Sequence, residues 1–414
     1  MRSGAPSFAA VNACRLFVGL LFAVLTSSVL AQGNFDWPQW RGPKRNGISE
    51  EKDFRIQWPK EGPHRLWTAK VGIGFSSVSV VGGKLYTMGN VTDVDHVMCL
   101  EVATSKLLWD YKYPCAAVDP NGYHGPRCTP TVDGERVFTV SRRGHVLCLN
   151  AATGALVWTK NLVTDFGGGI PAWGFAGSPL VEGELLILET SAAARSVAAL
   201  DKKTGRVVWA NGNFAAGYSS PVAFPLARDR AVAVFSAGGL TGRAASNGRI
   251  LWHYNWRTTY EVNTATPIVF EDKIFISSGY NSGCALLQMT ADTIKPVWTN
   301  KNMKNHMNSC VLWQGHLYGF DEGQLCCLDV ITGAVKWTNP SYGKGSLMLA
   351  DAILILYGER GRLGLAEASP AGFRELASAQ VLGGNNTWAA PVLANGRIYC
   401  RSQADLVCLD VTGR

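Results

Sequence analysis

Short runs in which hydrophobic and polar residues alternate fill the chain from about residue 64 to its end. Four such runs follow one another at 129–133, 135–141, 145–149 and 155–160, and a turn containing glycine separates each run from the next. Alternation with a period of two residues predicts half-buried β-strands, and tight glycine turns join antiparallel strands. Each unit is therefore predicted to be one four-stranded antiparallel sheet.

A tryptophan in the fourth run of most units sets the length of the repeat. Repeats of this length are typical of propellers and solenoids, in which each unit packs against its neighbours. The unit that begins near Ser346 has Phe373 and Leu376 in its fourth run and no tryptophan. The marker residues, spaced by 39 to 51 positions, are Trp109, Trp158, Trp209, Trp252, Trp298 and Trp337.

The two ends of the repeat region complement each other. The last residues, 406–414, match 147–154, but the tryptophan strand that should follow them is missing. Residues 64–71 form a strand of this missing type with no repeat in front of it. We therefore expect an all-β, eight-bladed propeller over residues 64–414, in which the N-terminal strand completes the C-terminal blade. Such closure removes exposed sheet edges, and a pair of β-sandwiches, the competing fold, does not explain the split repeat.

The repeat carries a family resemblance. The segment Ala199–Trp209 resembles the A-x-D-x-x-T-G-x-x-x-W motif of the quinoprotein-type (PQQ) repeat, and Cys327–Trp337 differs only in its first residue. The opening Asp36–Pro43, DWPQWRGP, also resembles secreted PQQ-like propeller proteins of environmental bacteria. The resemblance implies an eight-bladed propeller whose motif tryptophans dock neighbouring blades, while a fold of this kind says little about activity.

The N-terminus has the features of a cleaved secretory signal, residues 1–31. Arg2 and Arg15 precede the apolar run Leu16–Leu25, and Val29–Ala31 provides small residues for cleavage. The run is shorter than the ~20 residues that a membrane-spanning helix needs. Position 32 is glutamine, so a lipid anchor is not expected. We predict a periplasmic or secreted protein, without a transmembrane span, whose residues 32–63 form an N-terminal extension to the propeller.

Charge and cysteine content narrow the function further. The net charge of +8 is spread over 414 residues without a basic cluster, so a nucleic-acid partner is not predicted. No spacing of cysteine or histidine indicates a metal site. Cys115 and Cys128 flank one loop and are the most plausible disulfide in an oxidising compartment. The remaining pairings stay open.

The segments that lead into the innermost strands should line one mouth of the central channel. Polar groups that converge among aromatic side chains are typical of a small-molecule pocket. The alternative is that these residues only hydrogen-bond the loop backbone and, together with water, plug the channel. The histidines in these segments lack a recognisable catalytic partner, so no catalytic residue is predicted. The candidate ligand-binding residues are Arg127, Trp173, Tyr218, Glu261, Asn263, His306, Asn308, Lys344 and Trp388.

Two classes of function remain. The first is a monomeric binding or scaffold protein without a cofactor, similar to the BamB family of outer-membrane assembly factors or to a propeller that recognises sugars or polymers; its partner would be an envelope protein or a sugar ligand. The alternative is a PQQ- and Ca²⁺-dependent alcohol or polyvinyl-alcohol-type dehydrogenase, with Glu261 and Asn263 as oxygen ligands. The resemblance to these enzymes implies a vicinal disulfide beside the cofactor, but here Cys326 and Cys327 lie within one predicted strand.

Overall fold

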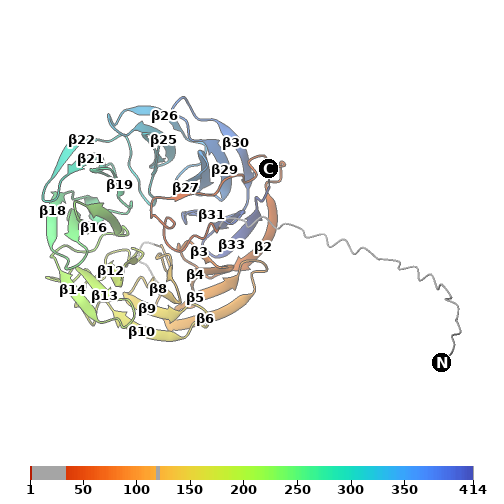
Figure 1. The fold of residues 1–414 in the computed structure, drawn as a ribbon. Coiled ribbons are helices and arrows are strands. Elements are labelled where there is room, and N and C mark those ends of the chain that lie inside the picture. Colours follow the sequence, from red (N-terminus) through yellow and green to blue (C-terminus); the bar gives the residue numbers. More distant parts are fainter. Residues whose placement is uncertain (2–33, 118–121, 414) are drawn as a thin grey trace. The chain divides into compact units, whose positions relative to one another are not determined.

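Eight β-sheets stand side by side around a central axis in the computed structural model of the chain (Figure 1). The structure describes Met1 and residues 34–117 and 122–413. Residues 34–414 belong to one compact unit, and the preceding unit is 1–33. The predicted signal peptide lies, apart from Met1, outside the described residues. Within the described part, no helix is long and apolar enough to span a bilayer.

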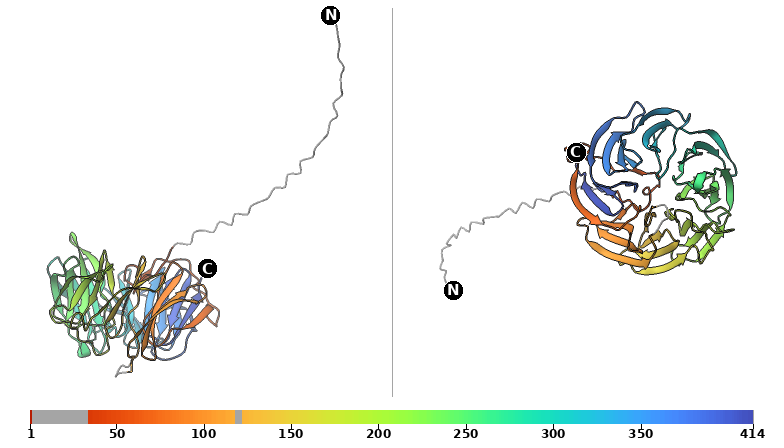
Figure 2. Two further views of the ribbon diagram at one scale, coloured as in Figure 1. Left: turned by 90° about the horizontal axis from the view of Figure 1, so that it is seen from below. Right: turned by 180° about the vertical axis from the view of Figure 1, so that it is seen from behind.

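Each blade has four antiparallel strands, as predicted (Figure 2), and in the sheet of blade 7 a short fifth strand is added in parallel. Blades 1 to 4 consist of β3 (Ser79–Val81), β4 (Lys84–Val91), β5 (Val94–Glu101) and β6 (Leu107–Pro114); β7 (Thr131–Asp133), β8 (Arg136–Val140), β9 (His145–Asn150) and β10 (Leu156–Asn161); β11 (Leu180–Glu182), β12 (Leu185–Glu189), β13 (Val197–Asp201) and β14 (Val207–Asn211); and β15 (Val222–Leu226), β16 (Asp229–Ser236), β17 (Gly239–Ala244) and β18 (Ile250–Asn255). Blades 5 to 7 consist of β19 (Ile268–Phe270), β20 (Lys273–Ser278), β21 (Gly283–Met289) and β22 (Ile294–Asn300); β23 (Val311–Trp313), β24 (His316–Asp321), β25 (Gln324–Asp329) and β26 (Val335–Asn339); and β27 (Gly345–Ala350), β28 (Ile353–Gly358), β29 (Arg362–Glu367) and β30 (Glu375–Gln380). Blade 8 consists of β31 (Val392–Ala394), β32 (Arg397–Arg401), β33 (Asp405–Asp410) and β2 (His64–Lys70).

The repeat motif works by joining a turn to the neighbouring blade. Asp201 Oδ1 accepts a hydrogen bond from the backbone N–H of Thr204 at 2.8 Å, which closes the turn. Gly205 follows with φ 71°, a conformation that glycine adopts at little cost. A Cβ at this position would lie 2.8 Å from the ring of Trp158. The ring of Trp158, from the preceding blade, therefore packs directly on the turn, and its Nε1 donates to the carbonyl of Lys202 at 3.1 Å.

The N-terminal strand closes the ring. Strand β2 pairs with β33 antiparallel, from His64 opposite Asp410 to Lys70 opposite Asp405. Figure 1 shows this orange strand beside the blue strands of blade 8. The predicted closure is confirmed, and it gives the last blade four strands, like the other blades.

Blade 8 is also fastened to blade 1 by side chains. Trp67 Nε1 donates to the carbonyl of Val102 at 2.9 Å. The buried guanidinium of Arg401 donates to the carbonyls of Ser76 at 2.8 Å and Gly72 at 3.0 Å. Burial lowers the pKa of Arg401 to about 9, so this cation stays charged at neutral pH. Its hydrogen bonds to carbonyl oxygens replace water as the partner of a buried charge.

Residues 34–51, here called the hub segment, cross the middle of the ring (Figure 1, red). The sequence predicted an N-terminal extension here but did not predict where it lies relative to the propeller. The segment ends in β1 (Ile48–Ser49), which pairs in parallel with β27. Its hydrogen bonds reach every blade: Trp37 to Val80, Pro38 to Val132, Arg45 to Pro179 and Pro221, Trp40 to Thr266, Arg41 to Cys310, Gly47 to Leu349, and Glu51 to Gly396.

The predicted disulfide is wrong. Cys115 and Cys128 are both free thiols, and both are buried. Cys128 Sγ accepts a hydrogen bond from the backbone N–H of Val140 at 3.4 Å, inside blade 2. Cys326 and Cys327 are likewise free and buried in β25. The described cysteines therefore act as small core side chains.

Candidate functional site

A cavity of about 130 Å³ lies at the mouth of the channel, where the segments leading into the innermost strands converge. An engineered protein cavity of roughly 150 Å³ holds one benzene molecule, so this space has room for no more than one six-membered ring. We call it the cup. The described residues that line it are Trp40, Phe75, Tyr123, Arg127, Trp173, Ala176, Ser178, Tyr218, Ser220, Val262, Thr264, Tyr280, His306, Met307, Asn308, Trp388 and Ala389.

One side of the cup is an aromatic cluster from blades 8, 1 and 2. Phe75 and Trp388 stack with their ring centroids 5.7 Å apart. Tyr123 lies 5.6 Å from Trp388 and 6.5 Å from Phe75. The guanidinium carbon of Arg127 lies 5.9 Å from the centre of the Phe75 ring, within the range of a cation–π contact. The first aromatic cluster, Phe75, Tyr123 and Trp388, thus presents a broad apolar wall.

The other side is a chain of rings from blades 3, 4 and 5. Trp173 meets Tyr218 edge to face at 5.7 Å and Tyr260 at 6.1 Å. Tyr260 in turn meets Tyr280 at 5.3 Å. Edge-to-face contacts between aromatic rings are favourable at these separations. The second aromatic cluster, Trp173, Tyr218, Tyr260 and Tyr280, therefore runs from inside the cup to its rim.

The floor of the cup comes from the hub segment. Trp40 lines the cup, and its Nε1 donates to Thr266 Oγ1 at 2.8 Å. Trp40 also borders a smaller cavity deeper in the channel, which Trp37 and Arg41 line. That second cavity measures about 10 Å³, no more than one water molecule needs, so the channel is closed to anything larger beyond Trp40. Sequence reasoning missed Trp40, although two tryptophans outside the repeat, at 37 and 40, were the available signal.

His306 is held in one tautomer at the wall. Lys344 Nζ lies 3.0 Å from His306 Nδ1, and an ammonium group can only donate, so Nδ1 accepts and the ring proton resides on Nε2. Burial, reinforced by the charge of Lys344, lowers the pKa of His306, while Glu322 at 3.4 Å opposes this. The imidazole is therefore neutral at neutral pH. The ring of Tyr280 packs on it at 4.3 Å.

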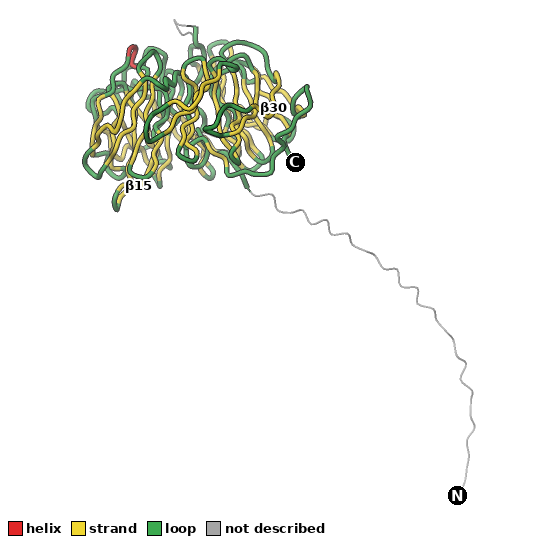
Figure 3. The backbone as a smooth tube through the Cα atoms, turned by 90° about the horizontal axis from the view of Figure 1, so that it is seen from above, coloured by secondary structure: helices red, strands yellow, loops and turns green. Residues whose placement is uncertain are grey.

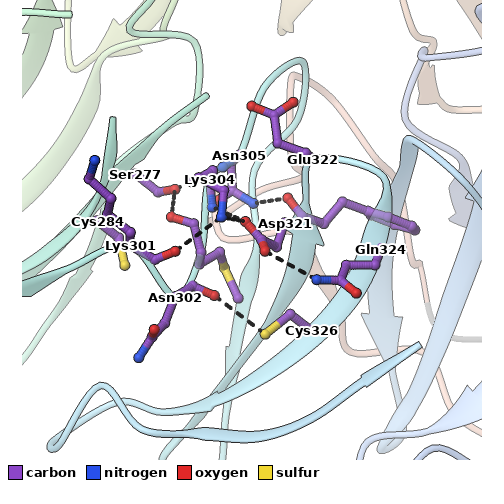
Figure 4. A network of polar contacts seen from close by, with 12 residues as sticks. Ser277, Cys284, Lys301, Asn302, Lys304, Asn305, Asp321, Glu322, Gln324 and Cys326 are labelled. Atoms are coloured by element: carbon purple, nitrogen blue, oxygen red, sulfur yellow. Dashed lines mark hydrogen bonds and ion pairs between the residues drawn. The ribbon is translucent and has the colours of Figure 1, made fainter. Parts of the chain in front are cut away.

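A polar network fixes the backbone just before His306 (Figure 4). Lys304 Nζ pairs with Asp321 Oδ1 at 2.8 Å, and the backbone N–H of Lys304 donates to the same oxygen at 3.0 Å. The next residue, Asn305, donates its N–H to Ser277 Oγ at 2.9 Å. Since Ser277 lies on β20 and Asp321 on β24, the network ties blade 5 to blade 6 and sets the position of His306.

Three residues of the cup carry buried polar atoms without a hydrogen-bond partner among the described residues. They are His306 Nε2, Asn308 Oδ1 and Trp388 Nε1. Asn308 is oriented by its own amide, which donates to the carbonyl of Gly345 at 2.7 Å. An unpaired buried polar group costs about 1–3 kcal/mol. Two donors and one acceptor in the wall of the cup thus have no protein partner among the described residues.

The structure brings six of the nine predicted residues to the cup and leaves three outside it. Lys344 lies behind His306, in a small neighbouring cavity. Glu261 is exposed and follows Tyr260 in the 3₁₀ turn η1 (Thr259–Glu261), the red turn on one end face of Figure 3. Asn263 is fully buried, and its amide bonds the carbonyls of Ser236 and Trp256 and the hydroxyl of Ser278. The six that line the cup are Arg127, Trp173, Tyr218, His306, Asn308 and Trp388.

These positions do not fit a Ca²⁺–quinone site. Ca²⁺ takes about six to eight oxygen ligands, usually with carboxylates among them, and no carboxylate belongs to the described residues that line the cup. The amide oxygen of Asn263 already accepts a hydrogen bond from the hydroxyl of Ser278 at 2.8 Å, and Glu261 lies outside the cup. In the described chain, no group of three or more candidate metal-binding side chains occurs. The lining instead offers aromatic rings, neutral hydrogen-bonding side chains and the guanidinium of Arg127.

Comparison with known proteins agrees with the fold. The family described as outer membrane protein assembly factor BamB matches residues 116–339, more than half of the chain. The crystal structure of BamB from Moraxella catarrhalis has a TM-score of 0.61 at 15% identity, covering 84% of this chain and 99% of that one. Quinohemoprotein alcohol dehydrogenase ADHIIG from Pseudomonas putida HK5 has a TM-score of 0.68 at 13% identity, covering 92% and 81%.

A europium-containing methanol dehydrogenase is also similar, with a TM-score of 0.65 at 12% identity, covering 90% of this chain and 89% of that one. No curated protein sequence matches the chain. At identities this low, the structural similarity establishes the shared propeller fold alone, and both binding proteins and enzymes use that fold. The chemistry of the cup must therefore be argued from its own residues.

Proposed function

The chain belongs to the protein family described as outer membrane protein assembly factor BamB, and from this we propose that it is a binding protein of the cell envelope. It acts by binding rather than by catalysis. Its ligand is one small hydroxyl-bearing ring, a monosaccharide unit, held in the cup. The proposed location, periplasmic or secreted, follows from the predicted signal at residues 1–31.

One observation carries the proposal: the cup combines two aromatic clusters with unpaired hydrogen-bonding atoms and holds no carboxylate among its described residues. The flat apolar faces of a pyranose pack on aromatic rings, because both surfaces are removed from water. Its hydroxyl groups both donate and accept, so they match the Nε2–H of His306, the Nε1–H of Trp388 and the Oδ1 of Asn308. Few polar groups in a mainly apolar pocket are typical of such sites.

The test is a titration of the purified protein with glucose, galactose, mannose and N-acetylglucosamine, followed by calorimetry and tryptophan fluorescence. We expect saturable binding of at least one sugar with a one-to-one stoichiometry. Trp388→Phe keeps a ring and loses the N–H, so affinity should fall roughly three- to tenfold, as one hydrogen bond implies. Trp58→Phe is the matched control, because it loses an N–H bond to the carbonyl of Arg55, whereas Trp58 does not line the cup.

A second arm of the titration uses PQQ with Ca²⁺ and measures alcohol-dependent dye reduction. Binding of PQQ together with dye reduction, and no binding of any of the four sugars, would establish the dehydrogenase in place of the proposal. Absence of all binding would refute a small-molecule role for the cup.

A further inference from the structure

We infer that the cup recognises the end of a sugar chain, with Tyr260 serving as the platform for the second sugar ring. This inference rests on the proposed function and adds to it the class of ligand and the residue that determines it. It depends on three observations: the closed floor of the cup, the exposure and backbone of Tyr260, and the continuous path of rings that joins Tyr260 to the interior.

The closed floor limits the cup to one terminal ring. The space of about 130 Å³ has room for no more than one six-membered ring. Trp40 lines this space, and the hub segment to which it belongs is hydrogen-bonded to all eight blades and so occupies the channel. A polymer therefore has no path through the channel. It can insert only an end, and its remaining rings must lie at the rim.

Tyr260 stands at that rim in a conformation that packing does not explain. The residue is 62% exposed, and its backbone has φ 66° and ψ 13°. Glu261 follows with φ 59°. A left-handed backbone at a bulky residue is unfavourable, and residues in such conformations cluster at functional sites. Burial of the ring does not compensate for the strain here, so a role at the mouth is the better account.

Tyr280 repeats this feature beside Tyr260. Its backbone has φ 51°, and Asn281 follows with φ 58°. The ring of Tyr280 lines the cup and contacts both Tyr260 at 5.3 Å and His306 at 4.3 Å. The two tyrosines with left-handed backbones therefore lie side by side, so that Tyr280 would contact the first sugar ring and Tyr260 the second.

The path from the inside to the outside is continuous. Trp173 lines the cup and meets the edge of Tyr260 at 6.1 Å, with the two ring planes at 90°. A ligand ring bound beside Trp173 would thus lie next to the exposed ring of Tyr260 without a gap. An aromatic surface outside a one-ring pocket is what a second sugar ring requires, because stacking on it removes apolar area from water.

The experiment compares single rings, chains and a chain without ends. The probes are glucose with maltohexaose and cellohexaose, N-acetylglucosamine with chitohexaose, and α-cyclodextrin, which contains the six glucose units of maltohexaose in a closed ring. At least one linear hexasaccharide should bind roughly three- to tenfold more tightly than its monosaccharide, as one added stacked ring implies. α-Cyclodextrin, which has no end to insert, should not bind to the cup.

Variants at Tyr260 separate recognition from folding. Tyr260→Ala should abolish the affinity gain of the hexasaccharide over its monosaccharide, while Tyr260→Phe should retain this gain. Tyr260→Gly should lose the gain, and its midpoint of unfolding by urea should not fall, because glycine relieves the left-handed backbone. Tyr111→Ala, on the outermost strand of blade 1, is the control for loss of a tyrosine away from the mouth.

The outcomes distinguish this inference from the proposed function. If monosaccharides bind but no hexasaccharide gains affinity, or if the gain survives in Tyr260→Ala, the end-recognition inference is overturned and the sugar-binding function stands. Binding of α-cyclodextrin as tightly as maltohexaose overturns it as well. If neither monosaccharides nor hexasaccharides bind, both proposals are overturned together.

Discussion

Trp67 offers a direct test of whether the closing strand β2 is a full member of its blade. Trp67 is 8% exposed, its Nε1 donates to the carbonyl of Val102 at 2.9 Å, and its ring lies 6.1 Å from Tyr399. Trp109 makes the equivalent contacts between blades 1 and 2, which follow each other directly in the sequence. It is also 8% exposed, with its Nε1 3.0 Å from a carbonyl oxygen and its ring 5.9 Å from a tyrosine.

Both Trp67→Ala and Trp109→Ala should therefore cost about 3–5 kcal/mol of unfolding free energy. This is the usual loss for a buried aromatic side chain, which leaves a cavity behind. Such a loss is a large part of the 5–15 kcal/mol that typically stabilises a folded domain. Loss of Trp67 at the interface between blades 8 and 1 should thus lower the unfolding free energy as much as loss of Trp109 at an ordinary blade interface.

The measurement is equilibrium unfolding in urea, followed by far-UV circular dichroism so that the loss of one tryptophan does not distort the signal. The wild type and the two variants are compared under the same conditions. If Trp67→Ala stays within about 1 kcal/mol of the wild type while Trp109→Ala loses several, β2 does not hold the ring together. The structural account of closure would then be wrong.

Two further predictions concern buried titratable groups. Burial raises the pKa of Glu189 to about 7 from 4.5, so the folded protein binds the extra proton between these values. The stabilising contribution is complete below pH 4.5 and is lost as the pH rises through 7; it amounts to no more than about 3 kcal/mol. Glu189→Gln should remove this dependence, and identical slopes of stability against pH in both proteins would contradict the assignment. Cys115 and Cys128, whose pKa values burial raises to about 12, should show no disulfide in the intact mass and react with a thiol reagent only after unfolding. Reaction of either thiol in the native protein would show that it is accessible.

The blades could be predicted from the sequence because the signals for each one are local. Asp201, Thr204 and Gly205 close their turn with hydrogen bonds among residues only three or four apart. The tryptophan that packs on the turn recurs at a fixed place in the repeat. Even the split blade could be recognised, since residues 64–70 carry the pattern of the strand that is missing after Asp410.

The mouth was harder to predict, because the direction of a side chain in an irregular segment depends on the backbone around it. Glu261 and Asn263 are two residues apart, yet one is exposed and the other is fully buried with its amide bonded on both sides. Tyr260 and Glu261, just before Asn263, both have left-handed backbone conformations. No spacing rule gives that conformation for residues other than glycine, asparagine or aspartate.

The sequence by itself thus determined the fold and its closure, since strands, turns and docking tryptophans are properties of each repeat. Only the tertiary structure decided that residues 34–51 run through the centre of the ring and that Trp40 forms the floor of the cup. That segment has no periodicity of its own, and its partners lie in all eight blades, far away in the chain. Its conformation exists only because the completed ring surrounds it.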